Sequence, residues 1–219
     1  ATAVVPISAG RHIYKREPSF PIAVACDPAF NFVYEANIRY LHHLGEVTYF
    51  SPLADTSLPD VGFVYLPGGY PELYLAALSA NRQMLQSIRR YVESGGKLLA
   101  ECGGMMYLCD EIRDKNGDVY PMAGVLHQSA TMENMKLRLG YRTLLYNETR
   151  LKGHEFHYSR LVEQQNPLPS CAVAYTAKGV ETDTPLYHYK NVWAGYTHLY
   201  WADPVGNEWF TKFVIDGNT

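Results

Sequence analysis

Cys102 stands between a short apolar run and two glycines, within residues 98–108. This pattern predicts a buried strand, a tight turn at the cysteine and the start of a helix. Such a turn lifts the thiol clear of the backbone, and Gly103 and Gly104 leave room for a substrate. The N-terminus of the helix favours a thiolate over a thiol. The segment therefore predicts a nucleophilic cysteine, and the alternative is a small buried side chain, a common state of intracellular cysteines.

A second turn, at residues 67–72, follows another apolar run that is predicted as a strand. Its free amides, above all that of Gly69, can face the amide of Gly103. Two such donors stabilise a tetrahedral oxyanion, and removing one costs roughly 10²–10³ in rate. Pro-Gly-Gly is also ordinary turn composition, so the turn predicts an oxyanion hole only in combination with Cys102. Tyr70 is a candidate for the substrate pocket beside it.

The base for this nucleophile has to come from eight histidines. His42 and His43 fall at the end of a predicted helix, where the helix dipole favours a cation. His198 lies in residues 192–201, which are predicted as one strand ending close to the start of the last helix. Ligands of open α/β sheets bind at the carboxyl ends of strands, so Cys102 and His198 can meet there. His198 is therefore the best-placed candidate base.

Residues 153–159 contain two histidines and a glutamate, but not at the helical spacing of zinc proteases. In a strand, His154 and His157 point to opposite faces. We therefore expect Glu155 and His157 to face a polar pocket, where they bind substrate or orient other groups, and we expect no metal. The sequence also contains no Gly-rich phosphate loop, which argues against ATP binding by this chain alone.

The composition favours a small ligand. The 219 residues carry a net charge of −3 and have a pI near 6.3, without runs of basic residues, which argues against nucleic acid and anionic membranes as partners. No apolar stretch reaches the ~18 residues of a membrane span, and no signal-peptide core is present, so a cytoplasmic protein is expected. Zinc-type spacing is absent among the four cysteines, and Cys26, Cys109 and Cys171 are predicted as core thiols.

The pattern of strands and helices predicts one domain over residues 21–219, preceded by a linker or tail over residues 1–20. Unbroken apolar strands alternate with helices in its first half, as in a parallel sheet that is covered on both faces. The first of these helices is expected to be capped near Asn31 and closed by Gly45. After about residue 112, short aromatic strands and Asn-Gly or Lys-Gly turns predict antiparallel additions.

Five segments together resemble the class I (triad-type) glutamine amidotransferase domains, and within them the glutaminase domain of the cobyrinic acid a,c-diamide synthase family. These segments are residues 29–32, 67–72, 100–108, 153–159 and 196–199. The resemblance runs from residue 21 to the C-terminus, and the segment 153–159 points to the corrinoid branch of the family. It implies a flavodoxin-like α/β fold: an open, mostly parallel sheet with helices on both faces.

The resemblance also implies an activity. Cys102 would attack the side-chain amide of L-glutamine with His198 as its base, and the amides of Gly69 and Gly103 would form the oxyanion hole. The ammonia released would serve ATP-dependent amidation of the a and c carboxylates of cobyrinate, in cobalamin biosynthesis. No cofactor is expected in this domain, while ATP and Mg²⁺ are expected in a synthetase domain fused upstream.

The sequence departs from the pattern of the resembled family in two ways, and these departures keep alternatives open. Class I enzymes carry a glutamate two residues after the catalytic histidine, and here Tyr200 holds that position, so the site is either a Cys-His dyad or recruits another acid such as Glu155. No synthetase domain is present in these 219 residues, which look like the C-terminal half of a longer protein. The alternatives are a nickel-sirohydrochlorin a,c-diamide synthase, a non-catalytic regulatory module, and a PfpI-type peptidase, which would carry histidine where Gly103 stands.

Overall fold

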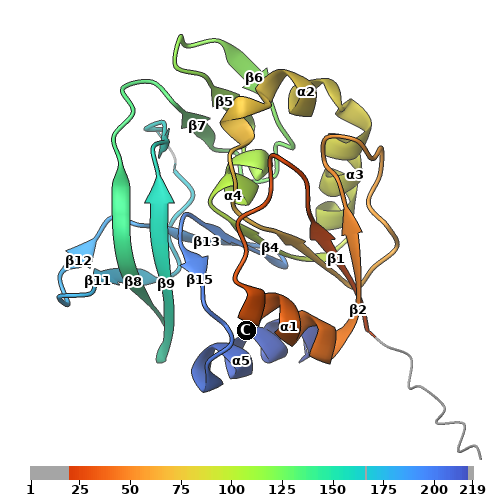
Figure 1. The fold of residues 1–219 in the computed structure, drawn as a ribbon. Coiled ribbons are helices and arrows are strands. Elements are labelled where there is room, and N and C mark those ends of the chain that lie inside the picture. The colour runs from red at the N-terminus through yellow and green to blue at the C-terminus, as the bar shows by residue number, and fades with distance from the viewer. Residues whose placement is uncertain (1–19, 166, 217–219) are drawn as a thin grey trace, which may run out of the picture.

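The computed structural model describes residues 20–165 and 167–216. Of the predicted linker, only Phe20 lies within this part of the chain, where it opens the first strand; the rest of the linker lies outside the described residues. Figure 1 shows a central sheet with helices on both sides and a separate group of long strands beside it. The described residues contain no helix that is long and apolar enough to cross a membrane.

The central sheet has six strands in the spatial order β13-β14-β4-β3-β1-β2. All neighbours pair in parallel except β13 and β14, which form an antiparallel edge. This arrangement confirms the predicted open and mostly parallel sheet. The strands are β1 (Phe20–Ala25), β2 (Gly45–Phe50), β3 (Phe63–Leu66), β4 (Lys97–Glu101), β13 (Leu186–Tyr189) and β14 (Val192–Gly195).

Helices cover both faces of this sheet. Along β1, Ile22 packs in one apolar cluster with α1 and α5, and Ala23 packs in the other with α2, α3 and α4. Figure 1 shows α1 and α5 together on one side of the sheet, with α2 and α3 on the other. The helical segments are α1 (Glu35–Leu44), η1 (Pro71–Leu73), α2 (Leu75–Ala80), α3 (Arg82–Glu93), α4 (Gly103–Leu108), α5 (Pro204–Thr211) and the π-helical η2 (Lys212–Asp216).

The second half of the chain adds two smaller sheets, with the orders β10-β7-β5-β6 and β12-β11-β8-β9-β15. All their pairs are antiparallel except β5 with β7, which confirms the predicted change after residue 112. The strands are β5 (Glu111–Arg113), β6 (Val119–Pro121), β7 (Ser129–Thr131), β8 (Arg138–Tyr146), β9 (Thr149–His157), β10 (Arg160–Leu161), β11 (Val173–Thr176), β12 (Glu181–Thr182) and β15 (His198–Leu199).

Two predicted boundaries were wrong. The helix α1 begins at Glu35, because Phe32 is extended and its N–H donates to the carbonyl of Gly68. Residues 192–201 do not form one strand: β14 pairs with β4, and the chain then leaves this sheet so that β15 pairs with β9. The break places His198 in the five-stranded sheet, just beyond the carboxyl end of β14.

The prediction of three core thiols was correct only for Cys109, which is buried. Cys26 is exposed because it follows the last buried residue of β1, and Cys171 is half-buried. An apolar run in the sequence marks the strand, but it does not show how far the neighbouring loops cover the strand's end.

Candidate active site

Cys102 occupies the turn between β4 and α4. Its backbone has φ 49° and ψ −106°, in a region that residues with a side chain rarely adopt, at a cost of order 1–3 kcal/mol. Two hydrogen bonds hold it there: its N–H donates to Gly195 O at 2.7 Å, and Met106 N–H donates to its carbonyl at 3.0 Å. The predicted strand, turn and helix are thus present, and the strained turn is fixed from both sides.

The thiol of Cys102 is buried, with Sγ 3.8 Å from the carbonyl oxygen of Phe156. Burial raises its pKa to about 12, and the nearby Glu72 carboxylate acts in the same direction. The expectation that the helix terminus favours a thiolate is therefore wrong in this conformation. The amide of Gly103 does lower the pKa, but loss of hydration outweighs it. Attack by this sulfur consequently requires a base.

Gly69 and Gly103 lie side by side. A β-carbon built on Gly103 would be 3.2 Å from Gly69 N and 2.7 Å from Pro71 Cδ. Gly69 itself has φ 156°, and a β-carbon on it would lie 2.1 Å from the carbonyl oxygen of Ala29. Neither position has room for a side chain, and the two backbones approach each other next to Cys102 because both residues are glycines.

His198, on β15, is buried against the same glycine turn. A β-carbon on Gly68 would lie 2.1 Å from His198 Cε1, and the imidazole also packs on Phe32 (4.4 Å between ring centroids) and stacks on His154 (5.1 Å). Its Nδ1 is buried without a hydrogen-bond partner. Burial, and secondarily His154 and His157, lower the pKa of His198 to about 3. The imidazole is therefore neutral at physiological pH, the protonation state of a base.

Cys102 and His198 reach the same corner of the molecule. Cys102 Sγ approaches the carbonyl of Phe156, and His198 stacks on His154, two residues earlier on β9. In the glycine turn after β3, Gly68 contacts the imidazole of His198. Gly69 in the same turn contacts Gly103, the residue after the cysteine. The structure thus gathers the predicted nucleophile, base and oxyanion glycines at the carboxyl ends of β3, β4 and β14.

Glu155 and His157 lie on one face of β9, as predicted, and both are buried. They line a polar pocket of about 350 Å³ that also includes Arg138 and Asp183. Glu155 forms an ion pair with Arg142 (2.6 Å), and among the described residues no hydrogen bond joins its carboxylate to His198. His157 stacks on Tyr196 at 3.8 Å, and burial lowers its pKa.

A smaller pocket opens directly on the thiol. Tyr70, the predicted pocket residue, lines it, and so does Glu72, which the sequence interpretation did not single out. Burial raises the pKa of Glu72. Its place three residues after Gly69, on the turn already assigned to the site, was the signal that could have identified it. The full lining is Gly69, Tyr70, Glu72, Cys102, Met106, Phe156, His157, Tyr158 and Ser159.

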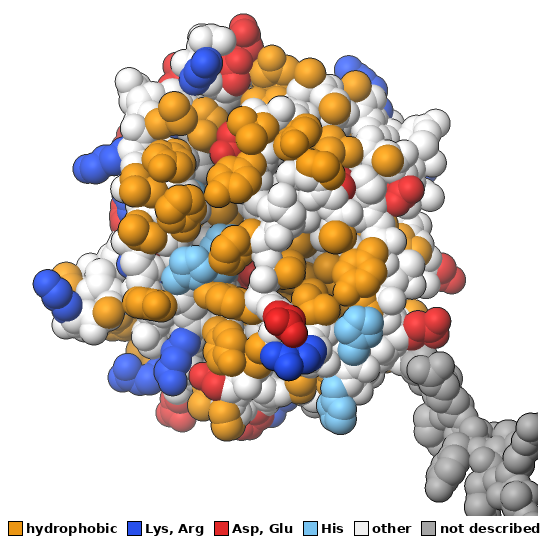
Figure 2. Space-filling view, viewed as in Figure 1, with side chains coloured by type: hydrophobic (Ala, Val, Ile, Leu, Met, Phe, Trp, Pro, Cys, Tyr) orange, Lys and Arg blue, Asp and Glu red, His pale blue; other side chains and the backbone are white. Residues whose placement is uncertain are grey.

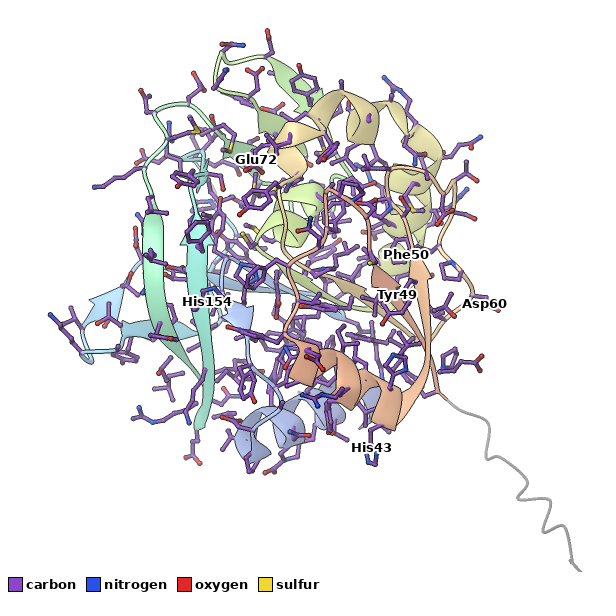
Figure 3. All side chains as sticks on the ribbon, in the orientation of Figure 1. His43, Tyr49, Phe50, Asp60, Glu72 and His154 are labelled. Carbon is purple, nitrogen blue, oxygen red and sulfur yellow. The ribbon has the colours of Figure 1, made fainter. Side chains whose placement is uncertain are left out.

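Figure 3 labels Glu72 on η1, which lines the thiol pocket, and His154 on β9, which stacks on His198. His154 Nδ1 hydrogen-bonds Tyr34 OH at 2.5 Å. Tyr200, at the position where the resemblance leads one to expect glutamate, packs edge-on against Tyr34 (5.5 Å) and is partly exposed. Figure 2 shows hydrophobic side chains gathered on the surface over β8 and β9.

Comparisons with known proteins show the family of this chain. The family model of the CobB/CobQ-like glutamine amidotransferase domain matches residues 21–205. The hydrogenobyrinate a,c-diamide synthase of Pseudomonas aeruginosa is 40% identical over 185 residues, which are 82% of this chain and 41% of that protein. The cobyrinate a,c-diamide synthase of Fusobacterium nucleatum is 40% identical over 188 residues, which are again 82% of this chain and 41% of that protein.

Solved structures support the fold. A glutamine amidotransferase from Thermotoga maritima superimposes with a TM-score of 0.54 at 12% identity, covering 91% of this chain and 84% of that one. The chain spans less than half the length of the curated relatives that it matches.

Proposed function

Since this chain belongs to the CobB/CobQ-like glutamine amidotransferase domain family, we propose that it hydrolyses L-glutamine through a thioester on Cys102. The observation that supports this best is one glycine turn that joins the parts: Gly69 lies against Gly103, next to the strained turn of Cys102, and Gly68 lies against the neutral, buried imidazole of His198. A nucleophile, a base and an oxyanion site are the three parts that acyl transfer requires.

In the proposed reaction, His198 takes the proton of Cys102 Sγ as the sulfur bonds to the amide carbon of glutamine. The amides of Gly69 and Gly103 donate to the resulting oxyanion. The imidazolium then protonates the nitrogen, the C–N bond breaks, and ammonia leaves. A water molecule attacks the thioester with His198 again as base, and glutamate departs with the thiol restored.

We further propose that the ammonia is used in a longer protein. The relatives named above are a,c-diamide synthases, and the chain covers only 41% of their length. The part that they have in addition would bind ATP and Mg²⁺ and activate the acceptor carboxylates of cobyrinate or hydrogenobyrinate. Nickel-sirohydrochlorin remains an alternative acceptor, because residues that contact the acceptor would lie mainly in that other part.

The test measures glutamate release from glutamine by the chain alone and by the chain joined to an ATP-binding part of this kind. We expect slow release by the chain alone, because the thiol is protonated, the imidazole has a low pKa and the pocket is narrow. Addition of ATP and acceptor to the joined protein should accelerate release. The Cys102→Ser variant of each form is the control and should release no glutamate. Activity in that variant would refute the thioester.

A further inference from the structure

The strand segment that carries His198 has two edges with different partners. One edge pairs with β9: His198 lies opposite His154, and Tyr200 N–H donates to the carbonyl of Lys152 at 2.7 Å. The other edge presents the backbone of Leu199 and Trp201 toward the interior, where no strand pairs with it among the described residues. Backbone groups at such a buried edge need other partners, since an unsatisfied buried N–H or C=O costs about 1–3 kcal/mol.

Glu101 satisfies part of this inner edge. Its Oε1 accepts the N–H of Leu199 at 3.0 Å and lies 3.4 Å from Trp201 Nε1, while its Oε2 accepts Tyr65 OH at 2.6 Å. The side chain is 2% exposed. Burial raises the pKa of Glu101 to about 7, against these three hydrogen bonds, which lower it.

Asn37, on α1, satisfies two further backbone groups of this edge. Its Nδ2 donates to the carbonyl of Leu199 at 2.8 Å, and its Oδ1 accepts the N–H of Trp201 at 3.1 Å. The side chain is fully buried. An amide that donates to one residue and accepts from the residue two places on imitates the pattern of a neighbouring strand. Together, Glu101 and Asn37 bind the backbone on the C-terminal side of His198.

We propose that Glu101 and Asn37 are positioning residues that hold the imidazole of His198 in register with Cys102. The inference rests on the proposed function. Glu101 directly precedes Cys102 in the chain, and its side chain holds the residue directly after His198. One residue therefore connects the turn of the nucleophile to the strand of the base.

In a catalytic triad, a carboxylate bonded to the imidazole fixes the orientation of the ring. Here the contacts of Glu101 and Asn37 with the backbone beside His198 fix it instead. Position 200 is a tyrosine directed to the surface, Glu155 is paired with Arg142, and Nδ1 of His198 has no partner. The orientation of the imidazole then depends on the strand that bears it and on the rings packed against it. A displacement of about 1 Å at such a site can cost roughly 10²-fold in rate.

The experiment compares steady-state glutamate release by four variants. Glu101→Met and Asn37→Leu keep the side-chain size but remove the hydrogen bonds to Leu199, so we expect kcat to fall about 10- to 100-fold with KM within about threefold. Glu101→Gln keeps an acceptor for Leu199 N–H and should stay within about threefold of the wild type. Tyr91→Phe is the matched control: it removes a hydrogen bond to the carbonyl of Lys97, at the opposite end of β4, without touching Glu101, Asn37 or the strand of His198, and should leave kcat unchanged.

The same changes are then made in a His198→Ala background. If Glu101 and Asn37 act through the imidazole, neither Glu101→Met nor Asn37→Leu should lower the residual rate further. An equal loss in both backgrounds would overturn the positioning role and indicate a purely structural one, as would full activity of Glu101→Met. A wild-type chain that releases no glutamate, although thermal unfolding shows that it is folded, would instead overturn the proposed function itself.

Discussion

Burial sets the protonation states of both principal side chains of the candidate site. It raises the pKa of the Cys102 thiol to about 12 and lowers that of His198 to about 3, so the thiol and neutral imidazole are strongly favoured over an ion pair. Substrate binding has to reduce this gap before the sulfur can attack. The resting site therefore holds the thiol and the imidazole in the protonation states that general-base catalysis starts from, but it reacts slowly, because a base of such low pKa takes the thiol proton poorly.

Substitution of the three histidines on β9 and β15 should affect the reaction in different ways. His198→Ala should lower thioester formation about 10²–10⁴-fold, the range of a lost general base. His154→Ala removes a stacked ring and a hydrogen bond to Tyr34, and should cost less than about tenfold. His157→Ala should act mainly on stability or on KM. Single-turnover acylation of each variant measures this, and near-normal acylation by His198→Ala would reassign the base.

The pKa of His198 also predicts a pH dependence of stability. A histidine that ionises near its ordinary pKa of about 6.5 when unfolded, but near 3 when folded, binds its proton preferentially in the unfolded state between these values. Stability is therefore lost as the pH falls below about 6.5. Relative to His198→Asn, the wild type should lose about 2 kcal/mol of unfolding free energy between pH 7.5 and pH 5. Urea unfolding of both proteins at the two pH values measures this. An equal change in unfolding free energy for the wild type and His198→Asn would contradict the prediction.

At the scale of elements, the sequence predicted the parts that local pattern determines. The apolar run before Cys102 and the glycines after it led to β4, the turn and α4. The start of α1 and the split between β14 and β15 were missed. Both depend on pairing with distant segments, at Gly68 and at β9, which periodicity does not reveal.

The glycine turn after β3 predicts a position-specific effect. Gly68→Ala would place a β-carbon 2.1 Å from His198 Cε1, so the imidazole must move, and we expect kcat to fall about 10²-fold. Gly179→Ala is the control, because its β-carbon would meet nothing within 4 Å while its φ of 75° strains the backbone. This control should lose about 1 kcal/mol of stability and no activity. Equal kinetics of the two variants would contradict the close contact with His198.

At the scale of the whole molecule, the candidate site lies where two unlike halves meet. The parallel sheet provides Cys102 and the glycine turn, while the five-stranded sheet provides His198 and the wall of the pocket that β9 forms. The sequence singled out Cys102 and His198 as candidates, but the exposure of Cys26 and the pairing of Glu155 with Arg142 depend on tertiary contacts. Such contacts are set by residues far apart in the chain and leave no local pattern.

The most direct test of the account maps the four cysteines by mass spectrometry after brief treatment with a diazo-ketone analogue of glutamine. Iodoacetamide is the comparison reagent, and it should modify the exposed Cys26 first. The analogue should instead modify the buried Cys102, with protection by excess glutamine and strong slowing in His198→Ala. The contrary result is modification of Cys26, Cys109 and Cys171 at the same rate as Cys102, or none at Cys102, and either would remove the nucleophile on which the proposed function depends.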